Sequence, residues 1–364
     1  MIIILLLLII GIQFQNNKNT VSHTDFFSKA QCNALKGIAC LYILFCHAHM
    51  TITFDSVLLW PILSIDRATI WSNGLFFFIS GYGLWISSQN KANYLAFPSL
   101  IKRLSSLAIP AILAYILYLF IPTSITNSRS PFAWFHFDDV VWFIIELFFL
   151  YILFWFIFGF IGKNVNSSLI LLSIMFCIIL VWDIIAFVTG RGLAWYASTL
   201  CFPLGILVSL WKSFSGKSTS ANNAYSQASI SINNKFATIP ASKTVIISLV
   251  ALIIAVITYF FYRQLPNFSL LGFLILANVS TLAFCIFIFF ISLKVHIGNR
   301  VTNFLGSISY EIYLVHLMAL KVMREFNIPN AAKIYLSILI CIIIAPIIHI
   351  IASKIIQTIH TIIR

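Results

Sequence analysis

A lysine and a histidine share one strongly apolar segment near the start of the chain. Lys36 and His47 lie eleven residues apart within residues 35–50, LKGIACLYILFCHAHM. At about 100° and 1.5 Å per helical residue, this spacing returns to within roughly 20° of the same face after a rise of roughly 16 Å. In a membrane helix, the lysine would lie at the surface and the imidazole near mid-bilayer, where ionisable groups usually have a function. His47 could act as a general base, or it could only hydrogen-bond a neighbouring helix.

A second set of cations, Lys102 and Arg103, begins another apolar segment. Basic residues in this position usually anchor a membrane helix on its cytoplasmic side. They could equally hold phosphate groups, because a guanidinium matches phosphate oxygens with two parallel hydrogen bonds.

Carboxylates occur inside two further apolar segments. Asp139, Trp142 and Glu146 follow the i, i+3, i+7 pattern of one helix face. A lone carboxylate such as Glu146 is costly within a membrane, so it should pair with a cation of another helix or take part in the chemistry. For Asp183 and Arg191, which flank the end of the next segment, a structural ion pair is the simplest account.

The segment near residue 310 carries three hydrogen-bonding side chains on one helix face. Ser309, Tyr313 and His316 follow the i, i+4, i+7 pattern. They could be interfacial residues, or they could form a polar wall that faces a sugar. Glu311 lies about 140° from His316 around the helix, so it should point elsewhere.

The sequence lacks the motifs of several other kinds of chemistry. It contains no HExxH, GxSxG, Walker or GxGxxG motif, and its seven cysteines form no CxxC pair. Catalysis by a metal, a serine triad or nucleotide hydrolysis therefore has no support.

The elements that must position these residues are membrane helices. Of the 364 residues, 61% are hydrophobic and 9% are charged, which is more apolar surface than a soluble domain of this size could bury. The sequence predicts an all-α fold, a polytopic transmembrane helix bundle of about ten spans. The predicted spans are about 36–53, 70–88, 104–121, 140–160, 168–188, 194–211, 244–262, 269–292, 302–320 and 334–356.

The basic residues indicate topology and not nucleic-acid binding. The net charge is +13, but the cations lie in loops between spans and not on one basic domain. If the segment before the first span is cytoplasmic, about two thirds of the Lys and Arg residues lie on the cytoplasmic side, which favours two cytoplasmic termini.

The domain organisation is simple. Residues 1–34 comprise a short apolar stub and a polar surface segment, residues 35–357 form the membrane domain, and residues 358–364 form a cytoplasmic tail. Within the membrane domain, residues 212–243 are rich in Ser and Asn and predict a mobile cytoplasmic loop.

Four of these segments, in this order, resemble membrane-bound acyltransferase family 3, whose integral-membrane members O-acylate cell-surface glycans. The first-span signature of that family is a basic residue, ten further residues and a histidine. Two positions depart from the family pattern, because Lys36 stands where arginine is usual and Gly74 where many members have an acid. The similar segments are Lys36-Gly37-Ile38-Ala39 with His47, residues 75–82, Trp142 with Glu146-Leu147, and residues 306–316.

The resemblance implies an O-acetyltransferase with acetyl-CoA as donor and no permanently bound cofactor. Its acceptor would be a hydroxyl of a cell-envelope polysaccharide or of its lipid-linked precursor, and its location the bacterial cytoplasmic membrane, in contact with lipid. His47 and Glu146 would be catalytic, with His47 the base or, as the lesser alternative, an acyl carrier. Lys36, Lys102 and Arg103 would hold the phosphates of the coenzyme, while Ser309, Tyr313 and His316 would line the acceptor side. The alternative function is a transporter or flippase for an anionic or lipid-linked glycan, which would have similar polar residues within the membrane.

Overall fold

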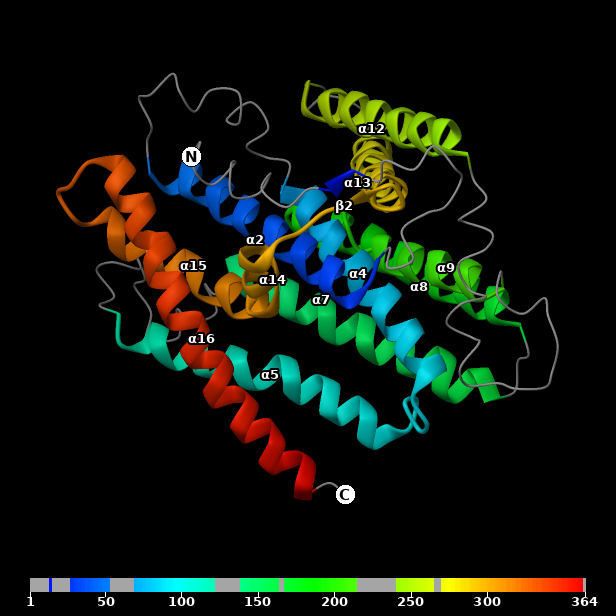
Figure 1. Ribbon diagram of the computed structural model, residues 1–364, viewed down its shortest axis with the longest axis horizontal. Coiled ribbons are helices and arrows are strands. Elements are labelled where there is room, and N and C mark those ends of the chain that lie inside the picture. Colours follow the sequence, from blue (N-terminus) through cyan, green and yellow to red (C-terminus); the bar gives the residue numbers. More distant parts are fainter. Residues whose placement is uncertain are drawn as a thin grey trace.

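The protein is a bundle of α-helices, seen in a computed structural model (Figure 1). The structure describes residues 13–14, 27–52, 69–121, 138–163, 167–214, 240–264 and 270–362. The eleven α-helices of these ranges are α2 (Lys29–Thr51), α4 (Thr69–Asn90), α5 (Phe97–Leu119), α7 (Asp138–Phe154), α8 (Ser168–Val188), α9 (Cys201–Phe214), α12 (Ala241–Gln264), α13 (Leu270–Ser292), α14 (Arg300–Ser307), α15 (Ser309–Arg324) and α16 (Asn330–Ile362). Shorter elements are the strands β1 (Gln13–Phe14) and β2 (Val295–His296), the π-helix η3 (Trp155–Phe160), and the 3₁₀ turns η4 (Ile161–Lys163) and η5 (Leu193–Trp195).

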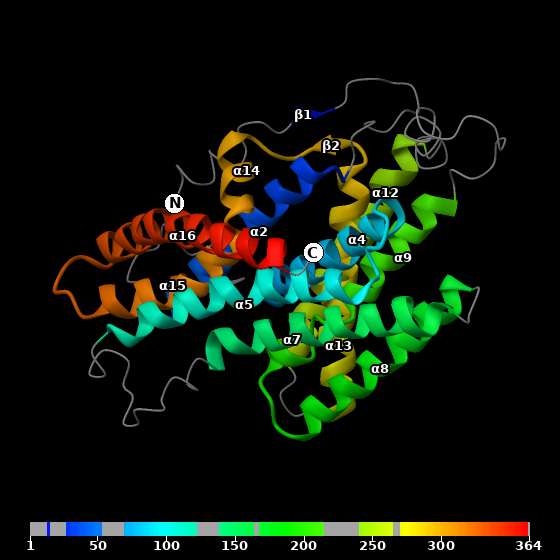
Figure 2. The same cartoon turned by 90° about the horizontal axis from the view of Figure 1, so that it is seen from below.

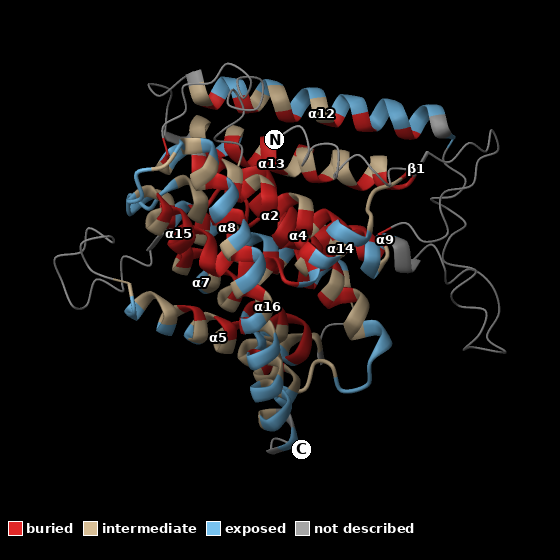
Figure 3. Cartoon of the chain, turned by 60° about the vertical axis from the view of Figure 1, so that its left-hand side comes forward, coloured by how far each residue is buried: buried red, intermediate tan, exposed pale blue. Residues whose placement is uncertain are grey.

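The helices confirm a polytopic membrane protein. Six of those described are long and apolar enough to cross a membrane: Phe97–Leu119, Val140–Phe160, Ser168–Val188, Ser242–Arg263, Gly272–Ser292 and Asn330–Ile359. Their outward faces carry exposed apolar side chains such as Ile253 and Ile350, as lipid contact requires. Figure 3 shows this pattern on α12 and α16, whose outer faces are exposed while the centre of the bundle is buried. All ten predicted spans coincide with helices, although α2, α4, α9 and α14–α15 fall outside this length and hydropathy criterion.

Helix α2 lies at the centre and contacts α4, α14 and α15 (Figures 1 and 2). Two glycines permit its close approach to α14. A Cβ atom on Gly37 would overlap the backbone carbonyl oxygen of Thr302, and one on Gly306 would overlap the backbone of Asn33. The glycines therefore let two backbones touch, which fixes the depth of α2 against the α14–α15 pair.

The predicted ninth span, 302–320, is not one continuous helix. Helix α14 begins with a capping box between Asn299 and Thr302 and ends at Ser307. Ile308 leaves the helical conformation, with φ −116° and ψ 16°, and α15 begins at Ser309. Ser309, Tyr313 and His316 all lie on α15, so the break does not divide the predicted face.

The ends of several elements differ from the prediction. Helix α2 begins at Lys29, capped by the Ser28 hydroxyl, and the buried ring of Phe27 packs edge-on against Tyr82. Residues 27–34 therefore belong to the bundle and not to a surface segment. Strand β1 pairs with β2, which the sequence did not predict.

The other boundary differences concern the polar loop and the tail. Helix α9 ends at Phe214, α12 begins at Ala241, and α16 runs through most of the predicted tail to Ile362. The sixth predicted span begins as a helix only at Cys201, after η5. The predicted apolar stub, 1–12, and most of the predicted mobile loop lie outside the described residues.

Candidate functional site

The two predicted histidines contact each other directly. His47 lies on α2 and His316 on α15, and the Nδ1 atom of His47 is 2.6 Å from the Nε2 atom of His316. The ring centroids are 4.9 Å apart and the rings are nearly parallel, at 16°. His316 is buried, with 1% of its surface exposed. The sequence predicted both residues, but not that they touch.

The backbone fixes the direction of the hydrogen bonds in this pair. The Nδ1 atom of His316 lies 2.5 Å from the carbonyl oxygen of Tyr313. A carbonyl can only accept, so this Nδ1 carries a hydrogen, and the Nε2 atom of a neutral His316 is then an acceptor. His47 must donate from Nδ1 to that atom, which leaves the Nε2 atom of a neutral His47 with its lone pair. His316 therefore holds His47 in the tautomer that a general base needs.

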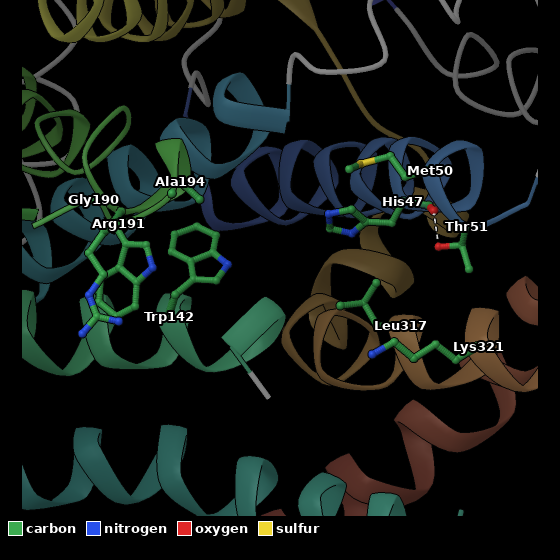
Figure 4. A pocket seen from close by; sticks show the side chains of 11 residues that line it. His47, Met50, Thr51, Trp142, Gly190, Arg191, Ala194, Leu317 and Lys321 are labelled. Atoms are coloured by element: carbon green, nitrogen blue, oxygen red, sulfur yellow. Dashed lines mark hydrogen bonds between the residues drawn. The ribbon is translucent and has the colours of Figure 1, made fainter. Parts of the chain in front are cut away.

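His47 faces a cavity of about 520 Å³ (Figure 4), which we name the His47 cavity. Figure 4 shows His47 and Lys321 on one side and Trp142 with Arg191 on the other. The hydroxyl of Thr51 donates to the carbonyl oxygen of His47 at 2.7 Å, which tightens the last turn of α2 beside the cavity. The described residues that line it are His47, Met50, Thr51, Trp142, Gly190, Arg191, Gly192, Ala194, Trp195, Leu317 and Lys321.

Lys36 faces a second, smaller cavity of about 150 Å³, which we name the Lys36 cavity. Ser309 and Tyr313 line it as well, so the structure brings these three predicted residues together. The other lining residues are Phe76, Ser80, Leu107, Phe143, Leu147, Tyr151 and Tyr310.

An aromatic pair connects the wall of the Lys36 cavity to the histidine pair. The ring of Tyr313 is 4.8 Å from that of Phe143 and 5.4 Å from that of His316. Phe143 and Tyr313 both line the Lys36 cavity, whereas Trp142, the neighbour of Phe143, lines the His47 cavity. One face of α2 thus presents a cation to one cavity and a base to the other.

The two basic residues near the start of α5, Lys102 and Arg103, lie in different surroundings. Arg103 donates to the carbonyl oxygen of Tyr94, and its guanidinium carbon lies 3.9 Å from the centre of the Tyr94 ring. Its Nε and Nη1 atoms are buried without a hydrogen-bond acceptor among the described residues. Arg103 is not among the described residues that line the Lys36 cavity. Within the described ranges, Lys102 has only backbone contacts, from the hydroxyls of two serines to its carbonyl oxygen, and it does not line the cavity either.

Glu146 is not brought to His47. It is fully buried, and its Oε1 atom accepts a hydrogen bond from the Trp182 indole of α8 at 2.9 Å. Trp142, one turn earlier on α7, lines the His47 cavity, whereas Glu146 lines neither cavity. Trp142 and Glu146 therefore lie in different surroundings, and a catalytic role for Glu146 stays a prediction.

The expected ion pair between Asp183 and Arg191 is wrong. Asp183 is fully buried and accepts a hydrogen bond from the hydroxyl of Thr199 at 2.6 Å. The guanidinium of Arg191 instead lies over the ring of Trp195, 5.0 Å from its centre, at the wall of the His47 cavity. No feature of the sequence indicated that the connection after α8 would place Arg191 over Trp195.

Sequence reasoning also missed a contact of Glu311. Its Oε1 atom lies 2.7 Å from the Nδ1 atom of His349 on α16. The prediction that Glu311 points away from His316 agrees with this contact. One feature of the sequence could have indicated this contact. An unpaired carboxylate in a membrane helix is costly, so a carboxylate such as Glu311 needs a partner. In the described ranges, no group of His, Cys, Asp or Glu side chains has the arrangement of a metal site.

Of the comparisons with known proteins, the one with protein families gives a match. No curated protein and no solved structure is detectably similar to the chain. The description of the acyltransferase domain of family 3 matches residues 30–352, a range that begins in the first turn of α2 and ends in α16. Both cavities and the histidine pair lie within this range, and the chain therefore belongs to acyltransferase family 3 as a membrane acyltransferase.

Proposed function

We propose that this acyltransferase moves an acetyl group from acetyl-CoA to a hydroxyl of a cell-envelope polysaccharide or of its lipid-linked precursor. The observation that carries the proposal is the His47–His316 contact, in which His47 lines one cavity and lies on the same helix as Lys36, which lines the other. The sequence also suggested a transporter. Membership of an acyltransferase family removes the support for that alternative.

His47 would be the base of the transfer. As the hydroxyl oxygen of the acceptor attacks the thioester carbon, the Nε2 atom of His47 takes the hydroxyl proton. The new C–O bond forms, the C–S bond breaks, and the imidazolium returns its proton to the departing thiolate. The charge that His47 holds in between is stabilised through the hydrogen bond to His316 and on to the Tyr313 carbonyl.

The donor would enter from the side of Lys36. A coenzyme A molecule has an anionic nucleotide end and a long, thin pantetheine arm. The narrow Lys36 cavity suits such an arm, and Lys36 lies on α2 roughly 16 Å from His47 by helical rise. Arg103 would add two guanidinium nitrogens, Nε and Nη1, as donors for phosphate oxygens, while Lys102 would contribute positive charge alone. Ser309 and Tyr313 would contact the arm and not the acceptor.

The acceptor would occupy the larger His47 cavity. With the cytoplasmic side assigned from the distribution of Lys and Arg, Lys36 lies toward the cytoplasm and Lys321 toward the opposite side. In this orientation, residues 35–357 would form the catalytic domain of an enzyme in the bacterial cytoplasmic membrane. That enzyme would use acetyl-CoA from the cytoplasm.

The test is loss of glycan acetylation when the base is removed. We expect a strain that lacks the gene to lose O-acetyl signals from its surface glycan, and the wild-type gene to restore them. His47→Ala should restore none, because removing a general base costs about 10²–10⁴-fold in rate. The control is His296→Ala, since His296 lies on β2 and lines neither cavity. If His47→Ala restores acetylation at an equal membrane level, the base assignment is wrong.

A further inference from the structure

We infer that the His47 cavity selects an acceptor that carries a negative charge beside its reactive hydroxyl, either the carboxylate of an acidic sugar or a sugar phosphate. The inference rests on the proposed function in assigning this cavity to the acceptor. It concerns Arg191 and Lys321, two residues with no predicted role in the site.

The described part of the cavity wall carries two positive charges. Arg191 and Lys321 both line it, and no Asp or Glu is among the described residues that do so. Neither side chain forms an ion pair in the part of the chain that the structure describes. Arg324, one turn after Lys321 on α15, forms an ion pair with Glu325 at 3.1 Å, so this nearby carboxylate pairs with Arg324 and not with Lys321. An anionic ligand would supply the charge that the protein omits.

Arg191 is held in position before any ligand arrives. Helix α8 ends in a Schellman motif, in which the Arg191 N–H donates to the carbonyl of Ala186 at 2.9 Å and the Gly190 N–H to that of Phe187 at 3.1 Å. Gly190 has the positive φ of 74° that this motif requires. The guanidinium carbon lies 5.0 Å from the centre of the Trp195 ring, a contact that restrains the side chain. Little conformational freedom is then lost when it binds two oxygens of an anion.

The remaining walls suit a sugar ring. Trp142 and Trp195 present large apolar planes against which the C–H face of a pyranose can pack. A volume of about 520 Å³ is within the range of small-molecule sites. Aromatic planes, two cations and the base His47 together fit one acidic sugar unit better than a neutral one.

The experiment compares three sugars of the same ring size. Purified full-length protein in nanodiscs of phosphatidylcholine is titrated with methyl glucuronide, glucose 1-phosphate and methyl glucoside, and binding is measured by isothermal calorimetry. We expect at least one of the two anions to bind about tenfold or more tightly than the glucoside. The stronger anion identifies whether a carboxylate or a phosphate is preferred. Equal affinity for all three sugars, or no binding of either anion, would overturn the inference.

Variants connect this preference to the two cations. Arg191→Gln and Lys321→Gln should each reduce the anion preference several-fold and leave acetyl-CoA affinity unchanged. The matched control is Arg263→Gln, because Arg263 also lies over an aromatic ring, that of Tyr259, but does not line the cavity. A fall in acetyl-CoA affinity in the Arg191 and Lys321 variants would show that the cavity holds the coenzyme instead.

The outcomes separate this inference from the proposed function. Failure of His47→Ala to abolish acetylation in cells would reject the base assignment, whatever the binding data show. Loss of the anion preference in the calorimetric comparison would reject only the charge of the acceptor.

Discussion

His316 illustrates how one buried side chain can set the chemistry of another. It accepts from the Nδ1 atom of His47 and is itself anchored to the Tyr313 carbonyl. A carbonyl oxygen cannot exchange roles with a ring nitrogen, so the whole series of hydrogen bonds has one direction. In this scheme His316 is a positioning residue, whereas His47 touches the reacting atoms.

Removal of the His316 side chain, which accepts the hydrogen bond from His47, should therefore slow the reaction without weakening acetyl-CoA binding. We expect His316→Ala to lower kcat about 10²-fold, since His47 then loses its preferred tautomer, with little change in KM for acetyl-CoA. His316→Gln should recover part of kcat, because its amide oxygen can accept from the Nδ1 atom of His47. Steady-state kinetics in nanodiscs would measure both. Equal kcat for the Ala and Gln variants would indicate that His316 matters only for packing.

Lys36 should act through donor binding and not through the chemical step. Lys36→Gln is expected to raise KM for acetyl-CoA more than it lowers kcat, because a contact with a remote phosphate is nearly the same in the ground and transition states. Lys36→Arg should be tolerated, since it keeps the charge and can form two parallel bonds to phosphate.

A matched substitution tests the specificity of this effect. Lys102→Gln removes an equal charge from a residue that does not line the Lys36 cavity, and it should raise KM less. Unchanged acetyl-CoA affinity in Lys36→Gln would leave Lys36 as a topology anchor.

At the scale of elements, the contact between α2 and α14 determines where His47 lies. Gly306→Ala would place a methyl group into the backbone of α2 at Asn33, so we expect it to destabilise the protein by about 1–3 kcal/mol and to lower activity. Gly83→Ala is the control, because no atom lies within 4 Å of its added Cβ. In helix α4 this change should be neutral or stabilise by about 0.5–1 kcal/mol. Thermal unfolding in detergent would measure both variants, and similar shifts for the two would contradict the close contact.

The positions of helices could be predicted from the sequence better than their ends and contacts. Runs of apolar residues long enough for a membrane span identify α5, α8 and α16, since hydropathy depends only on composition. The break at Ile308 directly follows Gly306 and Ser307, but α4 continues unbroken through Ser80 and Gly81, so such a pair alone does not identify a break. Helical spacing predicted that Ser309, Tyr313 and His316 share a face, because this follows from geometry within one helix.

Contacts between helices could not be predicted in the same way. The pairing of His47 with His316 joins residues 269 positions apart, and that of Glu311 with His349 joins different helices as well. The position of Arg191 depends on the turn that ends α8. Such contacts depend on how the helices are arranged around α2, which single-sequence periodicity does not determine.

For the whole molecule, the two cavities require a defined orientation in the membrane. If acetyl-CoA enters at Lys36, that end of α2 must face the cytoplasm. Reporter fusions should then place residue 235 in the cytoplasm and Lys333 on the opposite side, as the bias of Lys and Arg predicts. The opposite result would exchange the donor and acceptor sides of the enzyme.

The rings of Phe143 and Tyr313 have a consequence for how economically the enzyme uses its donor. A thioester that meets water before it meets a sugar is wasted as free acetate. Because these rings form part of the wall of the Lys36 cavity, a pantetheine arm held there would be surrounded by protein side chains until its thioester reaches His47. The narrow side holds about 150 Å³, roughly the share of five water molecules in the liquid. A donor arm in that space would therefore leave little room for water beside it.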